Sequence, residues 1–343
     1  MMNDRLMECV PNISEGKNPK IINEIVAVVK SVHNIKLLDV DSGQAANRTV
    51  ITFAGIPEAV VEAAFLLIKK SAELIDMSKH KGEHPRFGAT DVCPLIPIRG
   101  VTMEETIKFA RNLGARVGNE LRIPVYLYEN ASTQEKRKNL ANCRAGEYEN
   151  LKEKITSTEW KPDYGSLTYS EVVKKSGAVA IGARNYLIAY NVNLSTTSVE
   201  IANEIAKDVR ESGRKIKDKS GNSIHIPGLL PNVKAIGWYI DDFKLAQVSM
   251  NLTNVSITPL HVAFNEIIKA AQKRGVHVTG SELVGLIPLI CLTETADYIL
   301  KQQSKSTEIN ESEKVKIAIH YLGLSSVKPF VPEDKIIEYK LKS

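Results

Sequence analysis

The loop between Asp76 and Pro94 holds most of the residues in this chain whose types and spacing are suited to chemistry. It places two histidines, a glutamate and several cations around Gly82 and Pro85. Gly82 is a poor helix former, and Pro85 biases His84 toward extended backbone. A charged loop between an apolar helix and an apolar strand is a common place for a scaffold to display catalytic groups. We therefore take this loop as the candidate active site.

Two kinds of chemistry fit the histidines of this loop. The run from His80 to His84 matches H-x-x-E-H, the inverted zinc-peptidase signature. That mechanism needs both histidines on one helical face, and Gly82 and Pro85 oppose a helix, so we expect no metal site. The other reading is general acid–base catalysis by one histidine, because an imidazole titrates near neutral pH and can both take and return a proton.

A catalytic histidine works better beside a carboxylate that orients its ring. Asp39 and Asp41 share a face of an expected strand that ends at a turn, from which a carboxylate can reach a cleft. The alternative for Asp41 is a turn acceptor for the backbone amides around Ser42 and Gly43.

Other polar residues at strand ends are ambiguous when taken singly. Asn12 and Asn47 are equally typical of turn caps. Four arginines are candidate clamps for a substrate carboxylate, because a guanidinium forks onto that group: Arg48, Arg86, Arg99 and Arg184. For any single one of them, a surface ion pair is the more common role. The residues by themselves indicate one His-centred site for an acidic ligand.

The composition excludes several classes of protein. The chain has 343 residues, 43% of them hydrophobic and 25% charged, with a formal net charge of +5. These values are typical of a globular protein with a substantial core, and the basic residues are scattered, so we expect no nucleic-acid partner. No segment has the length and apolarity of a membrane span or a signal peptide. The four cysteines are far apart, as in the reducing cytoplasm, where we place the protein.

Hydrophobic periodicity predicts the same order of elements in both halves of the chain. The first half is expected to be β-α-β-β-α-β with an added α-β, and the second to repeat that order from Tyr186. We therefore predict an α+β fold, a duplicated ferredoxin-like sandwich with domains 1–180 and 181–343. The stretches 213–232 and 302–312 are predicted as mobile surface, and 144–169 as a long connector. The expected elements of the first half are strands 6–13, 36–41, 48–54, 92–98 and 125–128 and helices 18–32, 57–75 and 103–121.

The chain also resembles glutamate formiminotransferase, the formimino-transfer unit of folate-linked histidine degradation. The resemblance covers essentially the whole chain, and its matching segments lie in both halves. They are Glu8–Lys17, Leu38–Gly43, Asn47–Val50, Asp76–Pro97, Val125–Tyr128, Arg144–Glu149, Gly182–Arg184, Gly237–Tyr239, Gln247–Ser249 and Val284–Pro288.

The resemblance implies two subdomains with a folate tunnel between them. It implies His84 as the catalytic histidine, Asp41 as its supporting aspartate, and tetrahydrofolate as a co-substrate without a metal. It further implies that Asn12, Asn47, Arg48, Arg86, Asp163, Gly165 and Gly177 contact folate or substrate. Contacts within 166–176 are left open, because this chain is a few residues longer there than the animal proteins.

The implied reaction moves the formimino group of N-formiminoglutamate to N5 of tetrahydrofolate. Formyl transfer between glutamate and 5-formyltetrahydrofolate is the runner-up, and a folate binder without turnover is a third possibility. From where the sequence stops, we expect a stand-alone transferase whose product passes to a separate cyclodeaminase. A homodimer is expected from the family.

Overall fold

The chain divides into two compact units, Met1–Asn185 and Tyr186–Ser343, which are described separately below. The structure is a computed structural model that describes residues 5–44, 46–82, 85–217, 221–241 and 243–342. The predicted division after residue 180 would cut strand β7, Val179–Ala183, which is paired within the first unit. The boundary therefore lies a few residues later than the sequence suggested.

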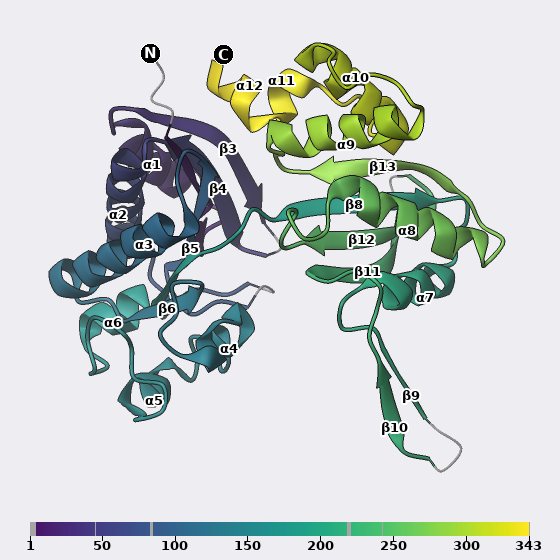
Figure 1. The fold of residues 1–343 in the computed structure, drawn as a ribbon. Helices are drawn as coiled ribbons and strands as arrows, with labels where there is room; N and C mark the ends of the chain where they lie inside the picture. The colour runs from purple at the N-terminus through teal and green to yellow at the C-terminus, as the bar shows by residue number, and fades with distance from the viewer. Residues whose placement is uncertain (1–4, 45, 83–84, 218–220, 242, 343) are drawn as a thin grey trace. The chain divides into compact units, whose positions relative to one another are not determined.

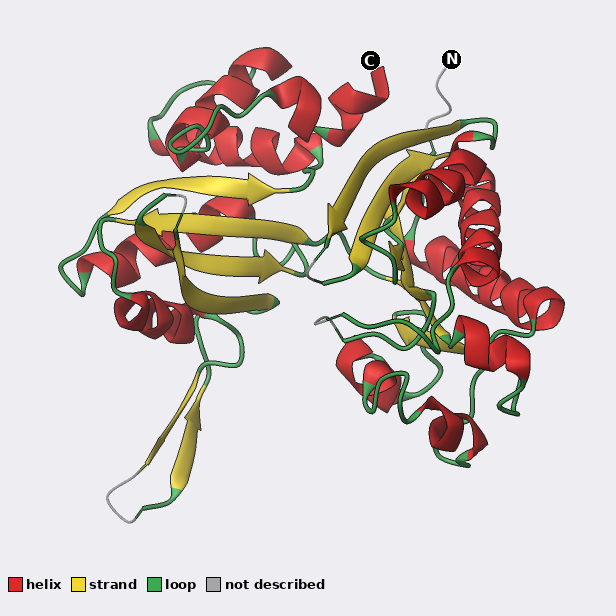
Figure 2. Cartoon of the chain, turned by 180° about the vertical axis from the view of Figure 1, so that it is seen from behind, coloured by secondary structure: helices red, strands yellow, loops and turns green. Residues whose placement is uncertain are grey.

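The first unit is a seven-stranded sheet with three long helices on one face (Figures 1 and 2). Strands β3, β4, β1 with β2, and β5 pair antiparallel in that order, which is the ferredoxin-like arrangement. Beyond β5 the sheet continues with β7 and then β6, both parallel to β5. The elements are β1 (Leu6–Cys9), β2 (Asn12–Ile13), α1 (Pro19–Lys30), β3 (Ile35–Gly43), β4 (Arg48–Gly55), α2 (Pro57–Leu74), β5 (Thr90–Arg99), α3 (Met103–Arg116), β6 (Val125–Glu129) and β7.

Local sequence signals fix where the elements of the first unit begin and break. The predicted strand over residues 6–13 is divided into β1 and β2 around Pro11, because proline has no N–H for a ladder. Asn18 caps α1 by accepting from the amide of Lys20 at 3.1 Å, and Thr102 opens α3 with a capping box. The apolar faces of the three helices pack on the sheet in one continuous core.

Short helices over residues 130–178 cover part of the other face of this sheet. The sequence indicated a long connector over part of this range, residues 144–169. The helices are η2 (Glu135–Arg137), α4 (Leu140–Arg144), α5 (Leu151–Thr156) and α6 (Glu171–Ser176). Their side chains form a separate cluster with Phe87, Val92, Tyr126 and Ala180. These helices are too short to show a helical period in their apolar residues. Strand β7 is buried on both faces, so its sequence lacks the alternation of apolar and polar residues that marks a strand.

The second unit repeats the ferredoxin-like order, as predicted. Its four-stranded antiparallel sheet runs β11-β12-β8-β13, with the first and third strands at the centre, as in the first unit. Two of its helices, α7 and α8, pack on one face, and four more follow at the end of the chain. The elements are β8 (Ile188–Leu194), α7 (Val199–Val209), β11 (Val233–Ile240), β12 (Leu245–Leu252), α8 (Leu260–Gln272), β13 (Val278–Val284), α9 (Leu289–Gln302), α10 (Glu311–Leu322), α11 (Pro332–Lys335) and α12 (Ile337–Lys342).

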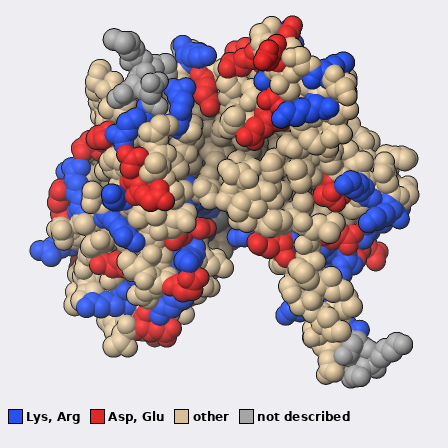
Figure 3. All heavy atoms as spheres, viewed as in Figure 1, with Lys and Arg blue, Asp and Glu red and all other residues tan. Residues whose placement is uncertain are grey.

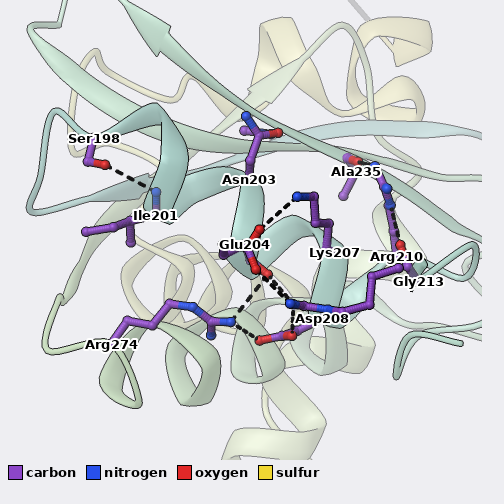
Figure 4. A network of polar contacts seen from close by, with 12 residues as sticks. Ser198, Ile201, Asn203, Glu204, Lys207, Asp208, Arg210, Gly213, Ala235 and Arg274 are labelled. Atoms are coloured by element: carbon purple, nitrogen blue, oxygen red, sulfur yellow. Dashed lines mark hydrogen bonds and ion pairs between the residues drawn. The ribbon is translucent and has the colours of Figure 1, made fainter. Parts of the chain in front are cut away.

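A two-stranded ribbon projects from the second unit between α7 and β11, where the sequence predicted a loop (Figures 1 and 2). Its strands are β9 (Arg214–Lys217) and β10 (Ser223–Ile226), paired antiparallel. Arg214 at its base pairs with Glu204 of α7 at 2.6 Å, and Arg274 pairs with Asp208 at the same distance. Glu204 also pairs with Lys207, and these residues belong to the network in Figure 4.

Charged side chains of both signs are interspersed on the face shown in Figure 3. Among the described residues, no helix combines the length and apolarity needed to cross a bilayer.

Candidate active site

The polar residues predicted from the strand ends of the first unit share one face of its sheet. Asp41 lies opposite Val50, Val50 opposite Asn12, and Asn12 opposite Val92. Directly paired residues point to the same side of a sheet. On β4, Ile51 and Phe53 pack against the helices. Side chains alternate along a strand, so Asp41, Val50, Asn12 and Val92 point to the face opposite those helices. Two strand spacings separate Asp41 from Asn12, or about 10 Å of backbone.

Asp41 and Asn12 differ in how strongly they are held. The carboxylate of Asp41 is exposed and has no hydrogen bond or ion pair to any residue the structure describes. Asn12 is buried: its amide donates to the carbonyl of Val10 at 2.9 Å, and its oxygen accepts from the guanidinium of Arg48. Asn12 therefore orients Arg48, whereas Asp41 is available to a partner that approaches this face.

Two further charged residues, which the sequence did not single out, lie around Arg48. The guanidinium of Arg144 pairs with the buried carboxylate of Asp91 at 2.5 Å, and that carboxylate also accepts from the amide of Phe87 at 3.1 Å. Burial lowers the pKa of Arg48 to about 10; the charge of Asp91 opposes this effect, and that of Arg144 adds to it. A guanidinium on this face of the sheet is a suitable partner for an anionic ligand.

The candidate loop is fastened to the turn between β3 and β4 by Asn47. The side-chain oxygen of Asn47 accepts from the amide of Gly16 at 3.0 Å, and its side-chain nitrogen donates to the carbonyl of Lys81 at 2.9 Å. The carbonyl of Asn47 lies 3.0 Å from Nε2 of His80. Asn47 has φ +47°, a left-handed conformation that asparagine tolerates better than most residues. Asn47 thus joins the turn to the first half of the loop.

Arg86 is held within the unit by acceptors on all five of its N–H groups. Its Nη1 donates to Glu147 at 3.0 Å and to Glu149 at 2.9 Å, and its Nη2 donates to Glu149 at 2.7 Å and to the carbonyl of His80 at 3.4 Å. Its Nε donates to Nδ1 of His80 at 3.3 Å. A guanidinium has five donors, so a substrate carboxylate would have to displace one of these acceptors. Arg86, one of the predicted clamps, is therefore already committed to acceptors of this unit.

These residues border an open depression of about 490 Å³ in the first unit. Its lining residues are Lys81, Gly82, Arg86, Gly146, Glu147, Glu149 and Asn150.

The downstream end of the loop is anchored to the residues around Gly177. The amide of Ala89 donates to the carbonyl of Ser176 at 2.7 Å, and the amide of Ala178 donates to the carbonyl of Phe87 at 2.9 Å. Gly177 has φ +67°, and a Cβ there would lie 2.3 Å from the carbonyl oxygen of Phe87. This position therefore requires glycine for backbone reasons. Glu83 and the predicted catalytic His84 lie outside the described residues.

Two other predicted folate contacts have internal roles. The carboxylate of Asp163 accepts from the amide of Leu127 at 2.8 Å and from the hydroxyl of Thr133 at 3.0 Å, and pairs with Arg137 at 2.6 Å. Gly165 has φ +89°, and a Cβ there would lie 2.0 Å from the carbonyl oxygen of Ile123.

Among the described residues, no group of three or more His, Cys, Asp and Glu side chains is arranged to hold a metal ion.

Two family models match successive parts of the chain. The model of the formiminotransferase domain, N-terminal subdomain, matches residues 6–184, and that of the formiminotransferase domain matches residues 189–342. Both fall within the two units of the structure.

Curated relatives match most of the chain. The glutamate formimidoyltransferase of Thermoplasma acidophilum is 45% identical over 86% of this chain and 92% of its own length. That of Streptococcus pyogenes is 41% identical over 87% of this chain and 94% of its own length. The formimidoyltransferase-cyclodeaminase of Sus scrofa is 47% identical over 98% of this chain, which spans only 60% of that longer protein. The chain therefore belongs to the glutamate formimidoyltransferase family.

Proposed function

We propose that this chain is a glutamate formimidoyltransferase that moves the formimino group of N-formimino-L-glutamate to N5 of tetrahydrofolate. The products are 5-formiminotetrahydrofolate and glutamate. One observation carries the proposal: two relatives named for this activity are 41% and 45% identical to this chain over more than nine tenths of their own length.

In the proposed mechanism His84 is the general base and then the general acid. It removes the N5 proton as the bond from N5 to the formimino carbon forms, which gives a tetrahedral intermediate. The resulting imidazolium then protonates the glutamate nitrogen as the bond between that nitrogen and the carbon breaks. The exposed carboxylate of Asp41 stabilises the imidazolium and holds its tautomer.

Electrostatics supports a role for Arg48 in binding. The guanidinium of Arg48, on the face of the sheet that carries Asp41 and Asn12, suits a carboxylate of the glutamate donor. Asn12 would keep the guanidinium of Arg48 in place. Asp163, Gly165 and Gly177 would shape the folate-binding segment through the backbone contacts described above.

The test mixes the purified protein with tetrahydrofolate and N-formiminoglutamate and measures product after acid conversion to the methenyl form. A parallel reaction contains N-formylglutamate. We expect product from the formimino donor, and a turnover lowered about 10²–10⁴-fold in His84→Ala. His33→Ala, at an exposed histidine, is the matched control. Product from the formyl donor alone would instead establish formyl transfer, and tight folate binding without product would indicate a binder.

We further propose that the protein acts in the cytoplasm as a homodimer. Sedimentation of the purified chain at twice the monomer mass would support the dimer.

A further inference from the structure

His80 has defined partners on both ring nitrogens, although the proposed chemistry does not use it. Its Nδ1 accepts from Nε of Arg86 at 3.3 Å, and its Nε2 lies 3.0 Å from the carbonyl oxygen of Asn47. A guanidinium only donates and a carbonyl only accepts. The two contacts are compatible only with a neutral imidazole that carries its proton on Nε2.

The partners of His80 come from separate parts of the first unit. Asn47 belongs to the turn that precedes β4, and its neighbour Arg48 begins that strand. Arg86 is held by Glu147 and Glu149, from the segment between α4 and α5. The bidentate pair with Glu149 fixes the plane of the guanidinium and hence the direction in which Nε points. His80 therefore joins the turn to a rigid arginine.

We propose that His80 and Arg86 are positioning residues for the transfer reaction. Arg86, fixed by the two glutamates, holds His80 as the Nε2–H tautomer, and His80 holds the loop against the β3–β4 turn. This inference rests on the proposed function, because it concerns the loop that carries the proposed base. It assigns Arg86 to the loop rather than to a substrate carboxylate.

The pairing of His80 fails when its ring is protonated. An imidazolium has no lone pair on Nδ1, so the bond from Arg86 is lost and two cations then face each other. The other charged groups acting on His80 are Lys17, which also opposes protonation, and Glu15 and Glu149, which favour it. Burial is the largest influence and lowers the pKa of His80. The neutral form is thus retained at neutral pH.

Three replacements of His80 separate its two contacts. His80→Asn places an oxygen near the position of Nδ1 and so keeps an acceptor for Arg86. His80→Gln places an amide near the position of Nε2 and so keeps a donor for the carbonyl of Asn47. His80→Ala removes both contacts. We expect kcat to fall about tenfold in the first two and about 10²-fold in the third, because small misplacements of a catalytic group have effects of this size. The KM for each substrate should change less than about threefold, since none of these side chains is proposed to touch substrate.

Two companion variants test the glutamate side of the contact. Glu149→Gln weakens the hold on Arg86 and should lower kcat in the same way, whereas His33→Asn, at an exposed histidine, should leave kcat unchanged. Nitrogen-15 spectra of histidine-labelled protein give a readout independent of activity. We expect the ring whose signal disappears in His80→Gln to show an unprotonated Nδ1 and a protonated Nε2 at pH 7.

The outcomes distinguish this proposal from the proposed function. Lack of transfer by the unmodified protein would overturn the function and this proposal together. An active protein in which His80→Ala keeps kcat within twofold would overturn the positioning role alone, even if the variant melts at a lower temperature. A raised KM with normal kcat in His80→Ala, or an Nδ1–H tautomer for the ring whose signal is lost in His80→Gln, would also overturn it.

Discussion

Asp163→Asn tests whether Asp163 serves the fold or the ligand. The sequence resemblance assigns Asp163 to folate, whereas in the structure both carboxylate oxygens accept from groups of the first unit. The substitution keeps the size of the side chain and one acceptor oxygen. It removes the negative charge beside Arg137, whose side chain is only 1% exposed. A buried guanidinium is then left without a counter-charge.

The magnitude follows from that burial. Breaking a buried ion pair by removing one partner costs about 3–5 kcal/mol. Because the asparagine oxygen still accepts from a backbone amide, we expect the lower end, about 3 kcal/mol. With a urea m-value of about 2–3 kcal/mol/M, the unfolding midpoint should fall by about 1 M or slightly more. The same change in a much more exposed pair, Glu62→Gln beside Arg116, should cost less than about 1 kcal/mol.

The assay uses a tryptophan that reports on the first unit. The chain has two tryptophans, Trp160 in the first unit and Trp238 in the second. The ring centroid of Trp160 lies 5.8 Å from the guanidinium carbon of Arg137. Fluorescence-detected urea unfolding of Asp163→Asn in a Trp238→Phe background therefore isolates the relevant unit. A loss below about 1 kcal/mol together with a tenfold higher KM for tetrahydrofolate would refute the structural role.

Three further predictions concern the same unit and the thiols. Gly177→Ala should destabilise the protein by more than about 2 kcal/mol in urea unfolding. The added Cβ is unfavourable in this left-handed backbone conformation, and it would also clash with the carbonyl oxygen of Phe87. The lowered pKa of His80 means that its contribution to stability is present above about pH 6.5 and is lost as the pH falls, so His80→Asn should flatten this part of a melting-temperature profile. Burial raises the pKa of Cys143 to about 11 and that of Cys291 to about 12, so a disulfide reagent at pH 8 should label them only after unfolding.

The sequence predicted what depends on local periodicity. Long amphipathic helices such as α2 and the paired strands β11 and β12 follow directly from the spacing of apolar residues. The duplication could be predicted from the order of helices and strands alone, because that comparison requires only the type of each element. The ferredoxin-like order of both sheets confirms it.

Contacts between distant segments were not predictable in this way. Arg86 is 63 residues from Glu149, and no pattern in a single sequence reports that pair. Asp91 and Arg144 lie in two separate segments that resemble the family, and nothing in the sequence indicates that their side chains form an ion pair. In the structure Arg86 and Asp163 form ion pairs with other residues of the first unit. Residue type alone does not distinguish such an internal ion pair from a contact with a ligand.

The order of strands at the edge of the first sheet has a consequence for folding on the ribosome. Strand β6 pairs only with β7 among the described strands, although more than 45 residues separate them in the sequence. The ferredoxin-like part can form as soon as β5 has been made, but β6 has no strand of the sheet to pair with until β7 has left the ribosome. Since the residues just before β7 also anchor the candidate loop, a nascent chain acquires its sheet edge and its loop geometry in one late, non-local step.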